Sequence, residues 1–477
     1  MRLTAQVAGV VWASSYNPTN RGRILALGLD SAGGRKRCNE QYRARTYCRS
    51  AGRRPQPVTL KKNRRICVIR QSTYPQDPRV RREVEALVES GYSVDVLCLG
   101  RAEDPPRERR EGLDIRRLRL AHRRGSPARY IFQYSAFFLW AFAQVSRLHL
   151  RRKYDVVQVN TLPDALVFAA AIPKLVGARV ILDMHELMPE LYASKFGRKR
   201  SAVRLMELIE HMSTRFADSV ITVSKPTWRV LVDRGIPPSK LEIIMNSADE
   251  RIFTSGDLSG ESPSSNPALT LISHGVLVER SGYRTIVRAL PEVCKVRPDV
   301  RLLIVGEGEA EAQLRELTRE LDLEEHVTLL GFKPLEEVAR LVRTADIGVT
   351  ANTKDVFTEL IVPTKLMEYV ALGVPAVVSR LPAVEQYFDE TMVNFFEPDD
   401  PEDLAWVILS VADDLASARE IARRTRERFL SEYGWATMKR RYVRLVDELA
   451  AAGGRSAATQ TTGRSRTHRR RWVRPGR

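Results

Sequence analysis

Short apolar runs alternate with longer amphipathic stretches along most of this chain. Residues 65–70 form a first β-rich run, residues 80–90 a helix, and residues 92–99 a second strand. The same pattern predicts strands at 113–120, 154–160, 178–183, 219–223 and 241–245, and helices at 130–150, 162–176, 201–217 and 226–235. Short buried strands that alternate with helices are typical of parallel, doubly wound sheets.

A second series of the same kind follows residues 254–267, which are rich in Ser, Gly and Pro and indicate a linker. Strands are predicted at 269–274, 300–305, 327–330, 347–350 and 376–379, and helices at 282–296, 309–321, 335–344, 363–373, 401–415, 417–433 and 435–449. Two such series predict an α/β protein of two Rossmann-like domains facing a cleft, at 63–253 and 269–433, with a linker at 254–268. Ligands are expected at the carboxyl ends of the strands.

The helix predicted at residues 363–373 carries candidate chemistry. Pro363 suits the first helical position, and Gly373 suits the position just past the end. Thr364, Lys365 and Glu368 share one side, and free N–H groups at a helix start can hold a phosphate. Glu368 lies roughly 6 Å along the axis from Thr364, which suits a bond to the ribose of a bound nucleotide. The alternative is an ordinary amphipathic helix with a surface Glu and Lys.

The positive charge of the chain is concentrated at its two ends. The formal net charge is +19. Residues 1–65 contain 15 Lys and Arg against 2 acids, and residues 454–477 contain 8 Arg and no acid, so residues 66–453 carry −2. We therefore expect basic disordered tails at 1–62 and 453–477 and a nearly neutral body, which argues against a nucleic-acid cleft.

Cysteine spacing and apolar segments bear on location. The 5 cysteines are scattered without metal-ligand spacing, which favours free thiols in a reducing cytosol. Residues 1–30 lack a signal-peptide pattern, and the apolar stretch 131–145 is short for a membrane span. The aromatic-rich helix at 130–150 has basic flanks, so it is either a core helix or a surface that lies on an anionic membrane. The expected location is cytoplasmic, with peripheral contact on the inner face of the membrane left open.

Several motifs in order resemble one enzyme family. They are Asp77-Pro-Arg-Val-Arg-Arg82, Leu162-Pro-Asp164, Asp183-Met-His-Glu186, Asn246…Asp249…Phe253, Val305-Gly-Glu-Gly308 and residues 363–375. Together they resemble the family 4 retaining glycosyltransferases (glycosyl transferases group 1) of the GT-B fold, over roughly residues 64–450. The resemblance implies sugar transfer from a nucleotide sugar bound to the C-terminal domain, with the acceptor on the N-terminal one. It also implies that a C-terminal helix, at 434–452, crosses back onto the N-terminal domain.

The resemblance assigns the donor site. Glu368 matches the second glutamate of the family's Glu-x7-Glu motif, which holds the donor ribose. The backbone at Thr364 and Lys365 would hold the diphosphate, beside the glycine turns at Gly275 and Gly306.

Two departures from the family pattern concern this donor site. The first glutamate of the motif is replaced by Leu360, and Glu359 is one residue off. Val276 and Ser281 stand where the family carries phosphate-binding Arg and Lys. Arg280 could supply that charge, or it could be a solvated loop residue.

The resemblance also suggests residues of the acceptor side. His185 matches a histidine close to the transferred sugar, where an imidazole can stabilise oxocarbenium charge. Asp183 could orient its loop. Glu186 is either an acceptor contact or a solvated helix start, and Asp77 and Arg79 are further acceptor candidates.

The expected chemistry needs no metal or other cofactor. No Asp-x-Asp motif stands out, and the helix start with Lys365 and Arg280 can neutralise the leaving diphosphate. Expected partners are a nucleotide sugar and a glycolipid or polysaccharide acceptor. Two alternatives remain: a GT-B epimerase of nucleotide sugars, and a degenerate GT-B protein that binds without turnover.

Overall fold

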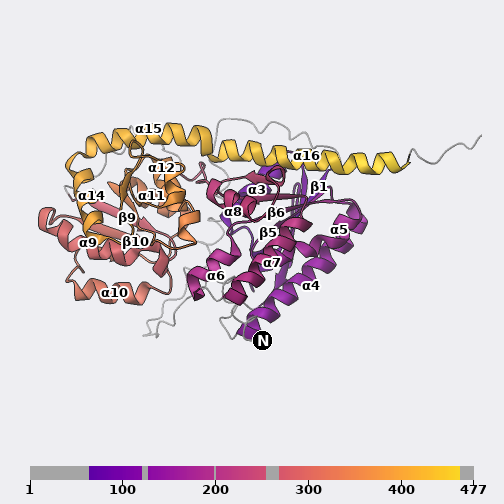
Figure 1. The fold of residues 1–477 in the computed structure, drawn as a ribbon, viewed down its shortest axis with the longest axis horizontal. Helices are drawn as coiled ribbons and strands as arrows, with labels where there is room; N and C mark the ends of the chain where they lie inside the picture. The colour runs from indigo at the N-terminus through magenta and orange to yellow at the C-terminus, as the bar shows by residue number, and fades with distance from the viewer. Residues whose placement is uncertain (1–63, 121–126, 198–199, 254–267, 462–477) are drawn as a thin grey trace, which may run out of the picture.

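The computed structural model describes residues 64–120, 127–197, 200–253 and 268–461. It contains two separate β-sheets in two lobes (Figure 1), the first coloured indigo to magenta and the second orange. The predicted linker at 254–268, apart from residue 268, and the predicted N-terminal tail at 1–62 lie outside the described residues.

The first lobe is built on an eight-stranded sheet in the order β3-β4-β2-β1-β5-β6-β7-β8. Its strands are β1 (Arg65–Thr73), β2 (Ser93–Gly100), β3 (Arg107–Arg110), β4 (Leu113–Arg119), β5 (Val156–Asn160), β6 (Arg179–Asp183), β7 (Ser219–Thr222) and β8 (Leu241–Ile243). All neighbours are parallel except β3, which runs antiparallel to β4. The central strands are apolar on both faces because helices cover both.

The helices of the first lobe connect these parallel strands. They are α3 (Pro78–Glu89), α4 (Pro127–Arg152), the short 3-10 helix η1 (Asp164–Ala170), α5 (Ala171–Leu175), α6 (Met188–Phe196), α7 (Arg200–Phe216), α8 (Lys225–Asp233) and the short η2 (Pro238–Lys240). Asp77 caps α3 by accepting the Val80 N–H, and Pro78 occupies the first turn.

The second lobe has six parallel strands in the order β11-β10-β9-β12-β13-β14. The strands are β9 (Thr270–His274), β10 (Arg301–Val305), β11 (Val327–Leu329), β12 (Ile347–Thr350), β13 (Ala376–Ser379) and β14 (Asn394–Phe396). Its helical segments are η3 (Glu279–Ser281), α9 (Tyr283–Val296), α10 (Glu311–Glu320), α11 (Leu335–Thr344), η4 (Thr358–Leu360), α12 (Thr364–Leu372), α13 (Pro382–Glu385), α14 (Pro401–Asp413) and α15 (Leu415–Tyr433).

The last helix, α16 (Trp435–Thr461), leaves the second lobe and runs along the first (Figure 1). It packs on α3, β5 and β6. Met438, Tyr442, Val446 and Ala450 are buried at four-residue spacing along one face. Each of the larger side chains contributes roughly 1.5–3 kcal/mol of burial, so α16 fastens onto the first lobe as the sequence predicted.

Most predicted elements are present, with informative differences. Strand β3 was not predicted because its four residues, Arg107–Arg110, are all charged; ion pairs such as Arg107–Asp114 (2.5 Å) join it to β4 instead. Short α6 and β14 were also missed.

Helix α16 also extends further than predicted. It continues to Thr461, past the end expected at residue 449. The tail predicted at 453–477 is therefore wrong for residues 453–461, where the helix simply goes on, and its remainder at 462–477 lies outside the described residues.

Two boundaries differ in the same way, at a proline. The helix predicted at residues 162–176 is split into η1 and α5, because the chain is extended at Pro163. Pro363 is likewise extended and caps α12 from outside, so the first helical residue is Thr364. Gly373 takes a left-handed conformation (φ 72°) and ends α12 as predicted.

Helix α4 spans 26 residues and is the longest of the first lobe. Within the ranges that the structure describes, neither α4 nor any other helix combines the length and the apolar character needed to cross a membrane.

Candidate active site

His185 lies two residues beyond the carboxyl end of β6. Its backbone N–H donates to the Thr161 hydroxyl oxygen (3.1 Å), and its Nε2 lies 3.1 Å from Asp183 Oδ2 and 3.3 Å from the Asn160 side-chain nitrogen. The side chain is only 14% exposed. Burial and the nearby charge of Arg70 lower the pKa of His185, although Asp183 acts in the opposite direction, so the imidazole is neutral near pH 7.

Asp183 is fully buried and is held from two other sides. Arg79 donates through Nε (3.0 Å) and Nη2 (2.7 Å) to its two oxygens, and Asn160 donates to Oδ2 (2.8 Å). Burial alone would raise the pKa of Asp183, but Arg79 and His185 outweigh it and hold that pKa below its usual range. The ionised carboxylate therefore fixes the position of the imidazole.

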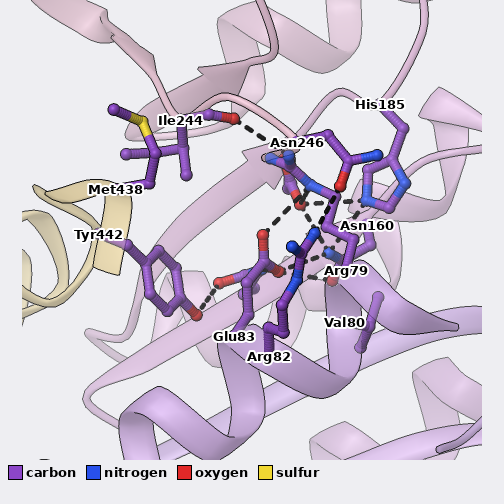
Figure 2. A network of polar contacts seen from close by, with 12 residues as sticks. Arg79, Val80, Arg82, Glu83, Asn160, His185, Ile244, Asn246, Met438 and Tyr442 are labelled. Atoms are coloured by element: carbon purple, nitrogen blue, oxygen red, sulfur yellow. Dashed lines mark hydrogen bonds and ion pairs between the residues drawn. The ribbon is translucent and has the colours of Figure 1, made fainter. Parts of the chain in front are cut away.

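The polar network continues from this pair to α16 (Figure 2). Asn160 and Gln158 donate to the same oxygen of Glu83 (3.2 and 2.8 Å), and the Tyr442 hydroxyl donates to Gln158 Oε1 (2.6 Å). Burial and the charge of Asp183 raise the pKa of Glu83, so this carboxyl keeps its proton near pH 7. A continuous chain of buried polar groups thus joins His185 to the crossing helix.

The second lobe presents a helix start and two glycine turns at the carboxyl edge of its sheet. Gly275 and Gly306 follow the neighbouring strands β9 and β10 and have φ values of 124° and 144°. A Cβ on Gly306 would lie 1.8 Å from the carbonyl oxygen of Gly275, so only glycine lets these turns touch. The first N–H groups of α12, at Thr364 and Lys365, have no partner inside the helix.

Glu368 lies on the second turn of α12, with a side chain 13% exposed. Its Oε2 is 3.3 Å from Nε2 of His274, at the end of β9. Burial, with a contribution from Lys365, lowers the pKa of His274 to about 3, so that ring is neutral. Burial raises the pKa of Glu368 to about 8, although Arg82 and Lys365 both lower it.

Lys365 turns inward instead of extending into solvent. Its Nζ lies 3.5 Å from both the Ser273 and the Tyr283 hydroxyl oxygens and 4.6 Å from the centre of the Tyr283 ring. Burial lowers the pKa of Lys365 to about 7, and Glu368 only partly offsets this. The pKa of this amine therefore lies where a bound anion would recharge it.

Arg280 is placed between the two lobes. Its guanidinium lies 5.5 Å from the centre of the Phe357 ring. Burial and then the charge of Arg280 lower the pKa of Lys195, on α6 of the first lobe. The loop that carries Arg280 therefore faces the segment that follows His185.

The position of the missing family glutamate makes contact with the first lobe. The carbonyl oxygen of Leu360 accepts from the Ser224 hydroxyl (3.0 Å), and its side chain packs on an apolar cluster of the first lobe. Phe357 is buried beside Met188 and Tyr192 of α6. This loop joins the lobes and places no carboxylate at residue 360.

The three predicted acceptor contacts have different surroundings. Asp77 caps α3 and pairs with Arg70 (2.9 Å), and Arg79 is buried and bonded to Asp183. Both are thus occupied within the protein and position other groups. Glu186 is half-buried beside His185, and its Oε2 has no hydrogen-bond partner among the described residues.

Arg82 was not singled out from the sequence as a site residue. It is buried, donates to Asn246 Oδ1 (2.7 Å) and to the Ser247 carbonyl, and stacks 5.2 Å from the Trp435 ring. Its charge lowers the pKa of Glu368 in the other lobe. Only its place in the Asp77–Arg82 motif pointed to it.

Within the described parts of the chain, no group of three or more His, Cys, Asp or Glu side chains is arranged to hold a metal ion.

Two parallel-sheet α/β domains with opposed helix starts and strand ends define a glycosyltransferase of the GT-B fold. The family models for the glycosyl transferase 4-like domain and for glycosyl transferases group 1 match residues 76–247 and 257–428. The chain therefore belongs to the family 4 glycosyltransferases and is a glycosyltransferase enzyme.

Relatives and solved structures agree with this assignment. The chain is 26% identical to a phosphatidylinositol N-acetylglucosaminyltransferase of Arabidopsis thaliana over 53% of this chain and 54% of that one. It is 25% identical to the amylovoran biosynthesis glycosyltransferase AmsK of Erwinia amylovora over 58% and 62%, so it spans about half to two thirds of these two relatives. An uncharacterized glycosyltransferase of Methanocaldococcus jannaschii matches at 22% over 75% of this chain and 90% of its own length.

Two solved structures share the fold. Sucrose-phosphate synthase from Thermosynechococcus elongatus superposes with a TM-score of 0.67 at 20% identity, covering 82% of this chain and 100% of that one. Anabaena Alr3699/HepE in complex with UDP superposes with a TM-score of 0.60 at 15% identity, covering 81% and 100%.

Proposed function

We propose that this enzyme transfers a sugar from a nucleotide-diphosphate sugar to a glycolipid or polysaccharide acceptor, with retention of anomeric configuration. The observation that carries the proposal is Glu368, one turn inside α12, with His185 on the opposing lobe. In this arrangement the ribose bonds to Glu368, and the sugar extends from the diphosphate toward His185.

Donor binding relies on the start of α12. The diphosphate lies on the N–H groups of Thr364 and Lys365, against Gly275 and Gly306, where the partial positive charge of the helix favours an anion. Because the pKa of Lys365 is about 7 before binding, the anion draws a proton onto the amine. Arg280 adds a fixed charge at the rim, so the leaving diphosphate is neutralised without a metal.

The sugar end of the site depends on His185. As the bond to the diphosphate lengthens, positive charge develops on the sugar ring, and an oriented neutral imidazole can stabilise it. Asp183 and Arg79 keep that imidazole in place. With Leu360 in place of a glutamate, the transferred sugar relies on contacts from the first lobe.

The names of similar proteins support both acceptor classes. The Arabidopsis relative is named for transfer to phosphatidylinositol, and the Erwinia relative for amylovoran biosynthesis. A solved structure of the Anabaena protein is described in complex with UDP-glucose, which supports a nucleotide sugar as donor.

We also propose that the enzyme works at the surface of an anionic membrane on its cytoplasmic side. Large apolar side chains are exposed on α4 and at the end of α5, including Phe132 (66%), Leu150 (65%) and Leu175 (83%). Arg147 and Arg151 are exposed on the same helix α4. Apolar groups beside basic ones suit insertion among anionic lipid headgroups.

A panel of nucleotide-diphosphate sugars tests the reaction. Thermal shift identifies the donor that stabilises the protein, and that donor is then incubated with a lipid extract. We expect free nucleoside diphosphate together with a glycosylated product. Isomerised donor would instead indicate an epimerase, and binding without turnover would indicate a degenerate protein.

Sedimentation with vesicles tests the membrane contact. The protein should sediment with vesicles of phosphatidylcholine and phosphatidylglycerol, and less with phosphatidylcholine alone. Leu175→Glu should weaken this binding. Equal sedimentation of both proteins with both vesicles would contradict the proposed surface.

A further inference from the structure

A pocket opens on the first lobe between α4, η1 and the end of β1. It has a volume of about 390 Å³, within the roughly 300–1,000 Å³ of small-molecule sites. Phe138, Leu139, Pro163, Ala165 and Leu166 supply most of its wall. Tyr134, Ser135 and Gln71 are the remaining lining residues, so the pocket is mainly apolar.

Gln71 is the unusual member of this wall. The residue is 9% exposed, and its buried Oε1 has no hydrogen-bond partner among the described residues. A buried amide oxygen left unpaired costs about 1–3 kcal/mol. A ligand with a hydroxyl group at this end of the pocket would remove that cost.

The pocket continues into the candidate active site. Gln71 directly follows Arg70, whose charge lowers the pKa of His185, and Arg70 pairs with Asn160 in the sheet register. Pro163 is two residues past Thr161, whose hydroxyl oxygen accepts the His185 N–H (3.1 Å). A molecule that fills the pocket can therefore present its polar end beside His185.

We propose that this pocket binds the hydrocarbon portion of a lipid-linked acceptor, with Gln71 accepting a hydrogen bond from a hydroxyl of its head group. The inference rests on the proposed transfer reaction and names which of the two acceptor classes the enzyme uses. An oligosaccharide would need many polar partners, because each buried hydroxyl left without one is costly, and this wall offers few. Leu139, 64% exposed on the same helix as Phe132, continues the apolar wall onto the outer face, which would connect the pocket to a bilayer.

Binding of n-decyl β-D-glucopyranoside, measured by calorimetry below its critical micelle concentration, tests the inference without turnover. Ala165→Phe fills the pocket and Leu139→Asp places a charge at its mouth, so each should weaken binding at least tenfold. Gln71→Leu should weaken it roughly three- to tenfold through the lost hydrogen bond. The matched control Leu175→Glu, at an exposed apolar residue away from the pocket, should bind as the wild type does.

Unchanged affinity in both Ala165→Phe and Leu139→Asp would overturn the inference. So would competition for the pocket by maltopentaose, which would indicate a polysaccharide acceptor. Nucleotide-sugar binding by the same variants verifies folding and separates the two proposals. If no protein of the set, wild type included, binds a nucleotide sugar, the proposed reaction fails while the amphiphile result stands on its own.

Discussion

Nε2 of His185 lies 3.1 Å from Oδ2 of Asp183, and the two side chains are held in different charge states. Asp183 stays ionised and His185 stays neutral. The ring proton is therefore placed on Nε2, facing the carboxylate, and none of the described residues bonds Nδ1. That nitrogen is left to face a substrate.

Replacing His185 should abolish most transfer while sparing the donor site. We expect His185→Ala to lower kcat roughly 100-fold or more, in line with the loss of one electrostatic stabiliser, with nucleotide binding changed little. His211→Ala, at an exposed histidine of the same lobe, is the matched control. Full turnover by His185→Ala would remove this residue from the mechanism.

Lys365 should destabilise the unliganded protein at neutral pH. Its pKa falls from 10.5 to about 7 on folding, so the unfolded chain binds more protons between these values and stability rises with pH across that window. The cost is full below pH 7 and disappears above about 10.5. Lys365→Met should therefore raise the thermal midpoint by several degrees at pH 6.5, by less at pH 9, and bind the nucleotide at least tenfold more weakly.

Thermal scans of wild type and Lys365→Met at the two pH values measure this effect. Lys354→Met, at an exposed lysine of the same lobe, should show no pH-dependent difference. An equal gain for Lys365→Met at both pH values would mean that the lysine is not buried in its charged form.

Restoring the family spacing at residue 360 should harm this protein. Leu360 packs on the first lobe, so Leu360→Glu would bury a carboxylate against apolar side chains at a cost of about 1–3 kcal/mol. Chemical unfolding should show this loss, whereas Leu360→Met should be nearly neutral. A gain in stability or transfer by Leu360→Glu would show that the position still faces the donor sugar.

The crossing helix should be coupled to the catalytic lobe through one hydroxyl. Tyr442→Phe removes the bond to Gln158 Oε1 (2.6 Å) and leaves that buried oxygen unpaired, which should cost about 1–3 kcal/mol. Val443→Ala, on the partly exposed side of α16, provides a comparison by urea unfolding. Stability equal to wild type in Tyr442→Phe would mean that the hydroxyl is satisfied elsewhere.

The order of elements was predictable from the sequence because buried parallel strands are short continuous apolar runs. The crossing of the last helix was also predicted, from the family resemblance. Strand β3 has no apolar residue, so no hydrophobic period could reveal it. Proline explains the two shifted helix starts, since the chain is extended at Pro163 and Pro363.

The site was only partly predictable for a different reason. Glu368, Lys365 and the two glycines were singled out from one helix and two strand ends, where local spacing is informative. The surroundings of Arg79 and Arg82 depend on contacts with residues more than 100 positions away in the sequence, which no local pattern reports. The same holds for the buried position of Lys365 beside Tyr283.

The most direct test of the account is equilibrium binding of the identified nucleotide sugar to Glu368→Ala. The control is Glu336→Ala, at an exposed acid of the same lobe. Because the ribose is expected to bond to Glu368, the account predicts at least tenfold weaker binding by Glu368→Ala and wild-type binding by the control. Undiminished binding by Glu368→Ala would contradict the donor site on α12.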